Sequence, residues 1–127
     1  MRLMPLCLLA SVLAWFTSSS LAAPVTITAA DAARSIHLNV GEELVLKLEN
    51  NPSTGYSWFL NEAKHPGLVS VGKPTYTDQA SMPGAGGIEW WNFRAVDRGV
   101  QSLRFEYRRP WEKKPPVKRV DFLVVIR

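Results

Sequence analysis

The stretch ELVLKLE, residues 43–49, carries a leucine at every second position. Successive side chains of a β-strand point to opposite faces, so this spacing puts the three leucines on one face and mainly charged side chains on the other. The stretch therefore predicts a half-buried β-strand, and similar short stretches are found on both sides of it.

Short apolar stretches follow one another along the chain and are separated by Gly, Pro, Asn and Asp. Besides residues 43–49, the stretches with strand character are 25–28, 36–38, 55–60, 68–71, 75–77, 88–96, 100–108 and 117–126. No long amphipathic helix is found, and residues 29–35 could form at most one or two helical turns. Because the stretches 25–28 and 36–38 are short, we expect seven or eight strands in an all-β antiparallel sandwich or barrel.

The front of the chain has the pattern of a secretory signal peptide. A basic start is followed by an apolar run at residues 3–16 and by small residues placed like those of a cleavage site, Ser20 and Ala22. The apolar run is too short to cross a membrane, which takes about 20 residues. We therefore expect residues 1–22 to be a signal peptide, with cleavage after Ala22 or Ala23.

We expect removal of this segment to leave residues 23–127 as a single exported domain, periplasmic or secreted, with no membrane attachment. The only cysteine, Cys7, leaves with the signal, so the mature domain has no thiol and no disulfide. A domain of about 105 residues can bury a sufficient core without such a cross-link. The sequence shows no internal repeat and no second domain, and we expect a monomer.

The charges and histidines do not point to an enzyme or to a nucleic-acid-binding protein. The formal net charge is +4, or +3 without Arg2, and this small excess is explained by a solvated basic loop. His37 and His65 have no Cys, His or carboxylate at metal-ligand spacing. No nucleophile-elbow motif is present. We therefore expect no catalytic residue, no metal, no cofactor and no nucleic-acid partner.

The sequence NPSTG, residues 51–55, has the composition of a stiff and neutral loop. Its proline fixes its own φ and pushes Asn51 toward an extended conformation. Gly55 can adopt a positive φ at no steric cost, and the residues between are small and carry hydroxyls. Such a tip could enter a cleft without desolvating a charge, although an ordinary turn between strands has the same composition.

Two further loops are distinctive. Residues 82–87, MPGAGG, leave almost no side chain, which suits either backbone that lies close against another surface or a flexible loop. Residues 108–116, RRPWEKKPP, place Trp111 among prolines and charges, where a core residue is not expected. An exposed tryptophan on such a loop is typical of a binding hot spot. The alternative is a tryptophan that folds back on the end of the sandwich and stacks under Arg109.

NPSTGY, GAGG and RRPWE occur in this order on a predicted all-β exported domain. Together they resemble the three signature loops of the chagasin family of cysteine-peptidase inhibitors, and the resemblance covers essentially the whole of residues 23–127. It implies an immunoglobulin-like β-sandwich whose three loops enter the active-site cleft of papain-like cysteine peptidases and block it reversibly. One departure is Ser53, where the family more often has threonine; the missing methyl group should affect only fine affinity.

The resemblance also implies which residues bind the peptidase. Residues 51–55, the central loop, would be the wedge, with Thr54 near the catalytic Cys and His of the peptidase and Tyr56 at its base. Residues 84–87, the glycine loop, would make backbone contacts along the cleft. Residues 109–111, the tryptophan loop, would pack against aromatic residues of the peptidase. The implied binding residues are Asn51, Pro52, Ser53, Thr54, Gly55, Tyr56, Gly84, Ala85, Gly86, Gly87, Arg109, Pro110 and Trp111.

A carbohydrate-binding or cell-envelope β-sandwich module is the alternative that the tryptophan content leaves open. Four of the five tryptophans lie outside the predicted signal. A sugar platform needs aromatic side chains side by side on one sheet face, whereas Trp90 and Trp91 are adjacent in a strand and should point to opposite faces. A purely structural envelope role would leave the three loops without a function.

Overall fold

The structure is a computed structural model that describes residues 2, 13–15, 22–61, 65–79 and 84–127. All nine stretches that the sequence marks as strand candidates contain a strand, one more than the seven or eight expected. The count is higher because both short N-terminal stretches pair with a partner strand. The elements are β1 (Val25–Thr28), η1 (Ala29–Ala33), β2 (Ser35–Leu38), β3 (Glu43–Asn50), η2 (Pro52–Thr54), β4 (Ser57–Asn61), β5 (Leu68–Ser70), β6 (Thr75–Asp78), β7 (Gly87–Ala95), β8 (Gly99–Arg108) and β9 (Lys118–Ile126).

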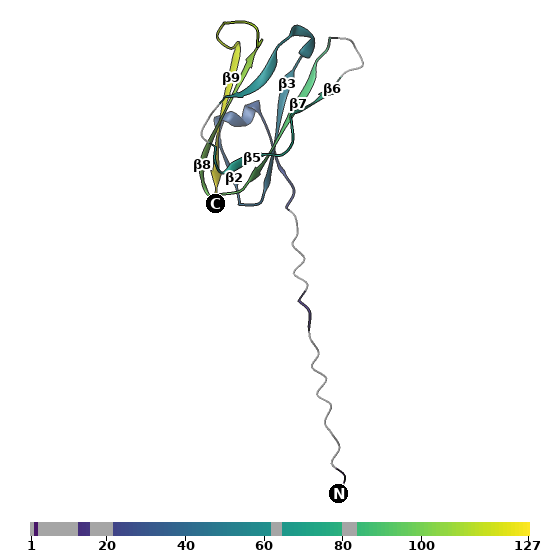
Figure 1. The fold of residues 1–127 in the computed structure, drawn as a ribbon, viewed down its shortest axis with the longest axis vertical. Coiled ribbons are helices and arrows are strands. Elements are labelled where there is room, and N and C mark those ends of the chain that lie inside the picture. Colours follow the sequence, from purple (N-terminus) through teal and green to yellow (C-terminus); the bar gives the residue numbers. More distant parts are fainter. Residues whose placement is uncertain (1, 3–12, 16–21, 62–64, 80–83) are drawn as a thin grey trace.

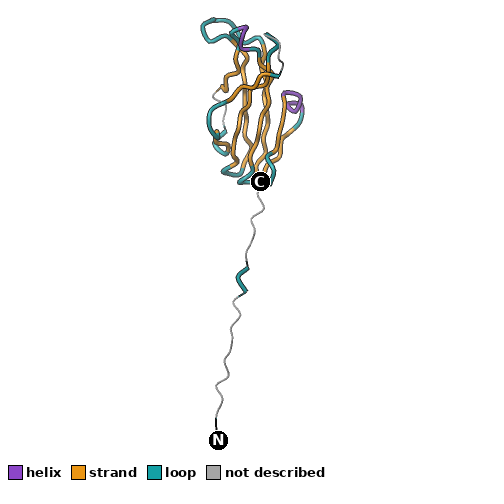
Figure 2. Tube along the Cα trace, turned by 90° about the vertical axis from the view of Figure 1, so that its right-hand side faces the viewer, coloured by secondary structure: helices purple, strands orange, loops and turns teal. Residues whose placement is uncertain are grey.

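The strands form two sheets that pack face to face (Figures 1 and 2). The first sheet has the order β1-β3-β7-β5, with β6 also paired to β7, and the second has the order β2-β9-β8-β4. The predicted all-β, immunoglobulin-like sandwich is therefore confirmed. Most pairs are antiparallel as expected, but β1 pairs with β3 and β2 pairs with β9 in parallel. The short helix η1 lies between β1 and β2 and carries the chain from one sheet to the other, so these two strands are not joined as a hairpin.

The hydrophobic core lies between the two sheets. Leu44, Leu46 and Leu48 of β3 are fully buried, which confirms the alternation predicted from ELVLKLE. From the second sheet, Phe105 of β8 reaches across to Phe93 of β7, with ring centroids 6.4 Å apart in an edge-to-face arrangement. Full burial of one such side chain stabilises a fold by about 1.5–3 kcal/mol. Packing of such side chains between the two sheets therefore stabilises the sandwich that carries the loops.

Trp90 and Trp91 point to opposite faces of the first sheet, as their adjacency in β7 predicts. Trp91 packs edge-on against Phe105 in the core, with ring centroids 5.1 Å apart. Trp90 lies on the outer face, where the Lys47 ammonium is 4.7 Å from its ring centroid. The two indoles therefore do not form a flat aromatic row, and no sugar platform arises from them.

Most of the predicted signal peptide, residues 3–12 and 16–21, lies outside the described residues, so the signal stays a prediction. The sandwich begins with β1 at Val25. In the parts of the chain that the structure describes, no helix has the length and apolar character needed to cross a membrane.

Candidate functional site

Strand register brings the three predicted loops to one end of the sandwich, which we call the loop end. There Asn50 of β3 lies opposite Gly87 of β7, and Ser57 of β4 lies opposite Arg108 of β8. The β3–β4, β6–β7 and β8–β9 connections therefore emerge together. Figure 1 shows the central loop between the other two at the top of the molecule.

The central loop is a single 3-10 turn with a fixed entry and exit. Asn51 is extended (φ −123°, ψ 91°), and Gly55 ends the turn in the left-handed region at φ 81°. The Thr54 hydroxyl donates to the Asn51 carbonyl at 2.6 Å, and the Ser53 hydroxyl donates to the Asn51 side-chain oxygen at 2.6 Å. The predicted extended Asn51 and positive φ at Gly55 are confirmed. The tip itself, residues 52–54, is exposed.

Trp111 lies against the central loop and exposes much of its side chain to solvent. The residue is 67% exposed. A Cβ added at Gly55 would lie 2.5 Å from Cη2 of Trp111, so the indole occupies the space that a side chain at Gly55 would take. Glycine is therefore required here both for the positive φ and for this close contact. The exposed part of the indole forms an apolar surface beside the tip of the loop.

Arg109 joins the tryptophan loop to the central loop. Its Nε donates to the Thr54 carbonyl at 3.0 Å, and its Nη1 forms an ion pair with Glu112 Oε1 at 3.0 Å. The guanidinium also lies 4.4 Å from the centroid of the Tyr56 ring. Arg109 thus stacks on an aromatic ring, and that ring belongs to Tyr56. The alternative placement of Trp111 would require Arg109 to stack on Trp111 instead.

Asn51 joins the central loop to the glycine loop on the other side. Its Nδ2 donates to the Gly84 carbonyl at 2.8 Å. A Cβ added at Gly86 would lie 3.1 Å from the Asn50 carbonyl, so the backbones of the two loops are in close contact. The small residues of the glycine loop permit this close approach of the two loop backbones. Met82 and Pro83 of the same motif lie outside the described residues.

A buried chain of hydrogen bonds beneath the central loop is not apparent from the sequence. The Tyr107 hydroxyl donates to Asn50 Oδ1 at 2.9 Å and accepts from the Asn51 backbone N–H at 3.3 Å. Asn50 Nδ2 donates to Glu89 Oε2 at 2.9 Å, and Trp91 Nε1 donates to Glu89 Oε1 at 3.0 Å. The chain connects a carboxyl group of the core to the backbone of the central loop.

The position of Glu89 is the one feature of the sequence that could have indicated this chain of hydrogen bonds. The period of two in β7 places it between inward-facing Gly87 and Trp91, where an acidic residue is unusual. Burial raises the pKa of the Glu89 carboxyl above its ordinary value, and hydrogen bonds from the Trp58 backbone and from the Trp91 and Asn50 side chains only partly offset this rise. A raised folded-state pKa means that the folded state binds the Glu89 proton more tightly than the unfolded state does. The resulting contribution to the free energy of unfolding is fully present at pH values below the unfolded-state pKa. That contribution is lost as the pH rises through the folded-state pKa.

Aromatic rings form the base on which the central loop rests. Tyr56 stacks on Tyr107 with ring centroids 5.3 Å apart, and Trp58 packs against Tyr107 at 4.9 Å. Trp58 Nε1 also donates to the Glu49 carbonyl at 2.9 Å, which ties β4 to the end of β3. Tyr56 therefore lies at the base of the central loop, where the resemblance placed it.

The assembled loop end suits recognition of another surface. The central and glycine loops carry no charged side chain. In the described part of the chain, no group of three His, Cys, Asp or Glu side chains could hold a metal ion. His37 lies on β2 and His65 precedes β5, and neither is part of the loop end. The fold thus brings the predicted site residues of all three loops together at the loop end.

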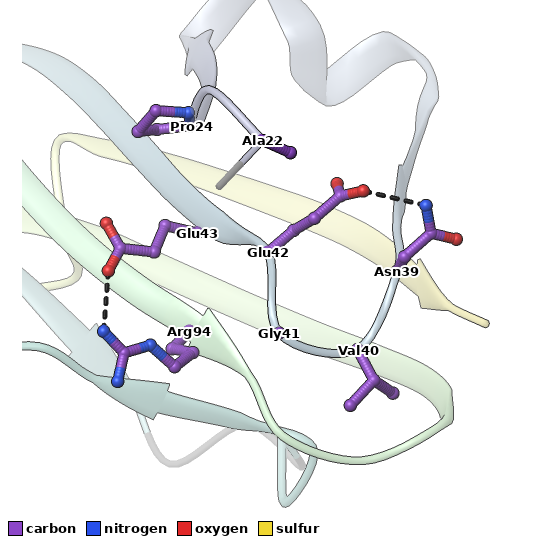
Figure 3. Close-up of a pocket in the computed structure, with 8 residues that line it drawn as sticks. All are labelled: Ala22, Pro24, Asn39, Val40, Gly41, Glu42, Glu43 and Arg94. Carbon is purple, nitrogen blue, oxygen red and sulfur yellow. Dashed lines mark hydrogen bonds and ion pairs between the residues drawn. The ribbon is translucent and has the colours of Figure 1, made fainter. Parts of the chain in front are cut away.

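A cavity at the opposite end of the sandwich does not belong to this surface (Figure 3). It lies around the turn between β2 and β3, beside the segment that enters β1. Its polar side chains pair with one another: Asn39 Nδ2 donates to Glu42 Oε1 at 2.8 Å, and Arg94 Nη2 donates to Glu43 Oε1 at 2.8 Å. These mutual pairs explain the polar groups of the cavity, and we assign no ligand to it.

Comparison with known proteins gives one consistent result. A sequence profile of the chagasin family peptidase inhibitor I42 matches residues 37–126. Chagasin from Trypanosoma cruzi is 26% identical over 89 residues, which cover 67% of this chain and 81% of that protein. Amoebiasin-2 from Entamoeba histolytica is 28% identical over 114 residues, covering 87% and 91%. The crystal structure of the cysteine protease inhibitor EhICP2 from Entamoeba histolytica matches with a TM-score of 0.70 at 25% identity, covering 81% of this chain and 94% of that chain.

We expect Tyr107→Phe to loosen the central loop while the core remains packed. The variant removes the hydroxyl that joins Asn50 to Asn51, and an unsatisfied buried polar group costs about 1–3 kcal/mol. Hydrogen exchange measured by NMR should show faster exchange of the Asn51 amide, and the thermal midpoint should fall. Tyr56→Phe is the matched control. The phenylalanine ring can still stack on Tyr107, and the Tyr56 hydroxyl that is removed does not belong to the chain of hydrogen bonds beneath the central loop. Equal Asn51 exchange rates in the two variants would contradict the role given to the Tyr107 hydroxyl.

Proposed function

The chain belongs to the chagasin family of peptidase inhibitors, which are inhibitors and not enzymes, and we propose that it inhibits papain-like cysteine peptidases by reversible occupation of the active-site cleft. The observation that carries this proposal is the loop end, where hydrogen bonds join three loops into one exposed edge without charge at its centre. A cysteine peptidase is the proposed partner because the related EhICP2 is itself a cysteine protease inhibitor.

Each loop has a distinct part in the proposed mechanism. The central loop enters the cleft, with Thr54 of its tip nearest the catalytic Cys and His of the peptidase. The glycine loop lies along the substrate cleft on one side, where its backbone can approach closely. Trp111 packs against aromatic residues of the peptidase on the other side. The inhibitor supplies no chemical group to the reaction, because filling the cleft is enough to exclude substrate.

The geometry of the loop end supports tight binding. The hydrogen bonds from Asn51 and Arg109 to the neighbouring loops fix its shape before a partner arrives, so little conformational entropy is lost on docking. A neutral tip enters the cleft without the desolvation cost of a charge. A standard interface buries about 800 Å² per partner. With these properties we expect a nanomolar dissociation constant, which corresponds to about −12 kcal/mol.

Titration of the purified mature domain against papain-like cysteine peptidases tests the proposed function. We expect reversible inhibition that is unchanged by dithiothreitol, because the only cysteine, Cys7, lies in the predicted signal. Activity of the peptidase should return on dilution of the complex. Lack of inhibition of several such peptidases at micromolar inhibitor would refute the proposal, and loss of inhibition in dithiothreitol would indicate thiol chemistry instead.

Trp111→Ala tests whether the tryptophan loop belongs to the binding surface. Loss of a hot-spot side chain should weaken binding by about 2 kcal/mol or more, which is roughly a thirtyfold higher inhibition constant. The thermal midpoint should change little because Trp111 is 67% exposed, whereas deletion of a buried tryptophan costs about 3–5 kcal/mol. Val100→Ala, at the opposite end of β8, is the control for loss of an exposed apolar side chain. An unchanged inhibition constant for Trp111→Ala would remove this loop from the proposed site.

We also propose that the protein is exported and functions in the periplasm or outside the cell. The basic start, the apolar run at residues 3–16 and the small residues at Ser20 and Ala22 support this proposal. Mass spectrometry of the protein from its native cell should find a mature chain that begins at Ala23 or Pro24. A chain that retains Met1 would disprove the signal peptide.

A further inference from the structure

The positive charge of the chain is concentrated beside the tryptophan loop. Residues 105–119, which we call the basic hairpin, contain six Lys or Arg and two Glu and so carry a net charge of +4. The formal net charge of the whole chain is also +4, so the other residues balance to zero. The basic hairpin consists of the ends of β8 and β9 and their connection, at one side of the loop end (Figure 1).

The arginines and the lysines of the basic hairpin differ in whether they form ion pairs. Its arginines lie near acidic side chains, in ion pairs that join Arg108 to Glu106, Arg109 to Glu112 and Arg119 to Asp121. Its lysines, Lys113, Lys114 and Lys118, are all exposed, and among the described residues none of them forms an ion pair. The Lys118 ammonium lies 5.6 Å from the centroid of the Tyr107 ring. The charges of Lys113 and Lys114 are therefore the ones available to a partner, whereas the arginines mainly hold the hairpin in shape.

The position of the basic hairpin relative to the central loop is fixed. Arg109 Nε donates to the Thr54 carbonyl at 3.0 Å, so a partner that covers the central loop also approaches the hairpin. The central and glycine loops contribute no charge. The residues of the central and glycine loops are therefore neutral, whereas the connection that carries the tryptophan loop is positively charged.

We propose that the basic hairpin directs this inhibitor to peptidases whose active-site cleft is bordered by acidic surface, an inference that rests on the proposed function. With the three loops in the cleft, Lys113 and Lys114 lie over the peptidase surface beside it. Exposed charges at the rim of an interface change mainly the association rate and its salt dependence. They act over about 8 Å at physiological ionic strength. The lysines of the basic hairpin thus select the partner during approach, while the central loop, the glycine loop and Trp111 determine how long the complex lasts.

Two charge reversals of equal size test this proposal. Lys113→Glu/Lys114→Glu inverts exposed charges of the basic hairpin. Lys73→Glu/Arg98→Glu is the matched control, because both residues are exposed and lie in the β5–β6 and β7–β8 connections, away from the loop end. Association and dissociation rate constants are measured by stopped-flow against two papain-like peptidases, one with an acidic and one with a basic cleft border, over a range of NaCl concentrations.

The hairpin variant should associate with the acidic-bordered peptidase about tenfold more slowly than the unmodified protein at low salt. Its dissociation rate should be unchanged, and the difference in association rate should vanish at high salt. The control variant should associate at nearly the rate of the unmodified protein. Equal slowing of both variants would mean that only net charge matters, and this result, or no slowing at all, would overturn the proposal.

The same experiment separates this inference from the proposed function. If the unmodified protein inhibits neither peptidase, the proposed function fails and the inference fails with it. If it inhibits both with association rates that do not depend on salt, only the inference fails. Binding to vesicles of anionic phospholipid that is lost in Lys113→Glu/Lys114→Glu, with unchanged association to the peptidase, would assign the lysines to an anionic surface and overturn the proposal.

Discussion

The hydrogen bond from the Tyr107 hydroxyl to the Asn50 side chain joins the two sheets at the end where the loops emerge. The tyrosine comes from β8 and the asparagine from β3, so the bond fixes the spacing of the sheets at this point. The same hydroxyl accepts the Asn51 N–H, and the entry into the central loop is therefore set by the sheets beneath it. The glycine loop and the tryptophan loop are in turn bonded to the central loop, so the whole loop end depends on this connection.

The buried Glu89 belongs to the same network of hydrogen bonds. A buried carboxyl group destabilises a fold unless hydrogen bonds satisfy it. Here the N–H groups of Asn50 and Trp91 donate to its two oxygens. An apolar residue at this position would avoid the desolvation cost but would leave the Asn50 amide without its acceptor. The acid therefore belongs to the support of the central loop, and its position inside the sheet follows from that role.

Shape and charge are separated in space at the loop end. The central and glycine loops are neutral and are joined by a hydrogen bond, so a close fit of these two loops involves no desolvation of charge. The charged part lies to one side, on the basic hairpin, where solvent screens it and where it can act at a distance. Cation–π contacts of Arg109 with Tyr56 and of Arg108 with Phe59 keep the base of that hairpin against β4.

The sequence by itself determined the strands, the family and the local form of the loops. The leucines of 43–49, the extended Asn51 and the positive φ at Gly55 follow from preferences that act within a few residues. Only the tertiary structure decided which strands pair in parallel and which groups meet beneath the central loop. Tyr107 and Asn50 are 57 positions apart, and Asn51 and Gly84 are 33 apart. Such contacts depend on the register and packing of both sheets together, and no single stretch of the chain contains that information.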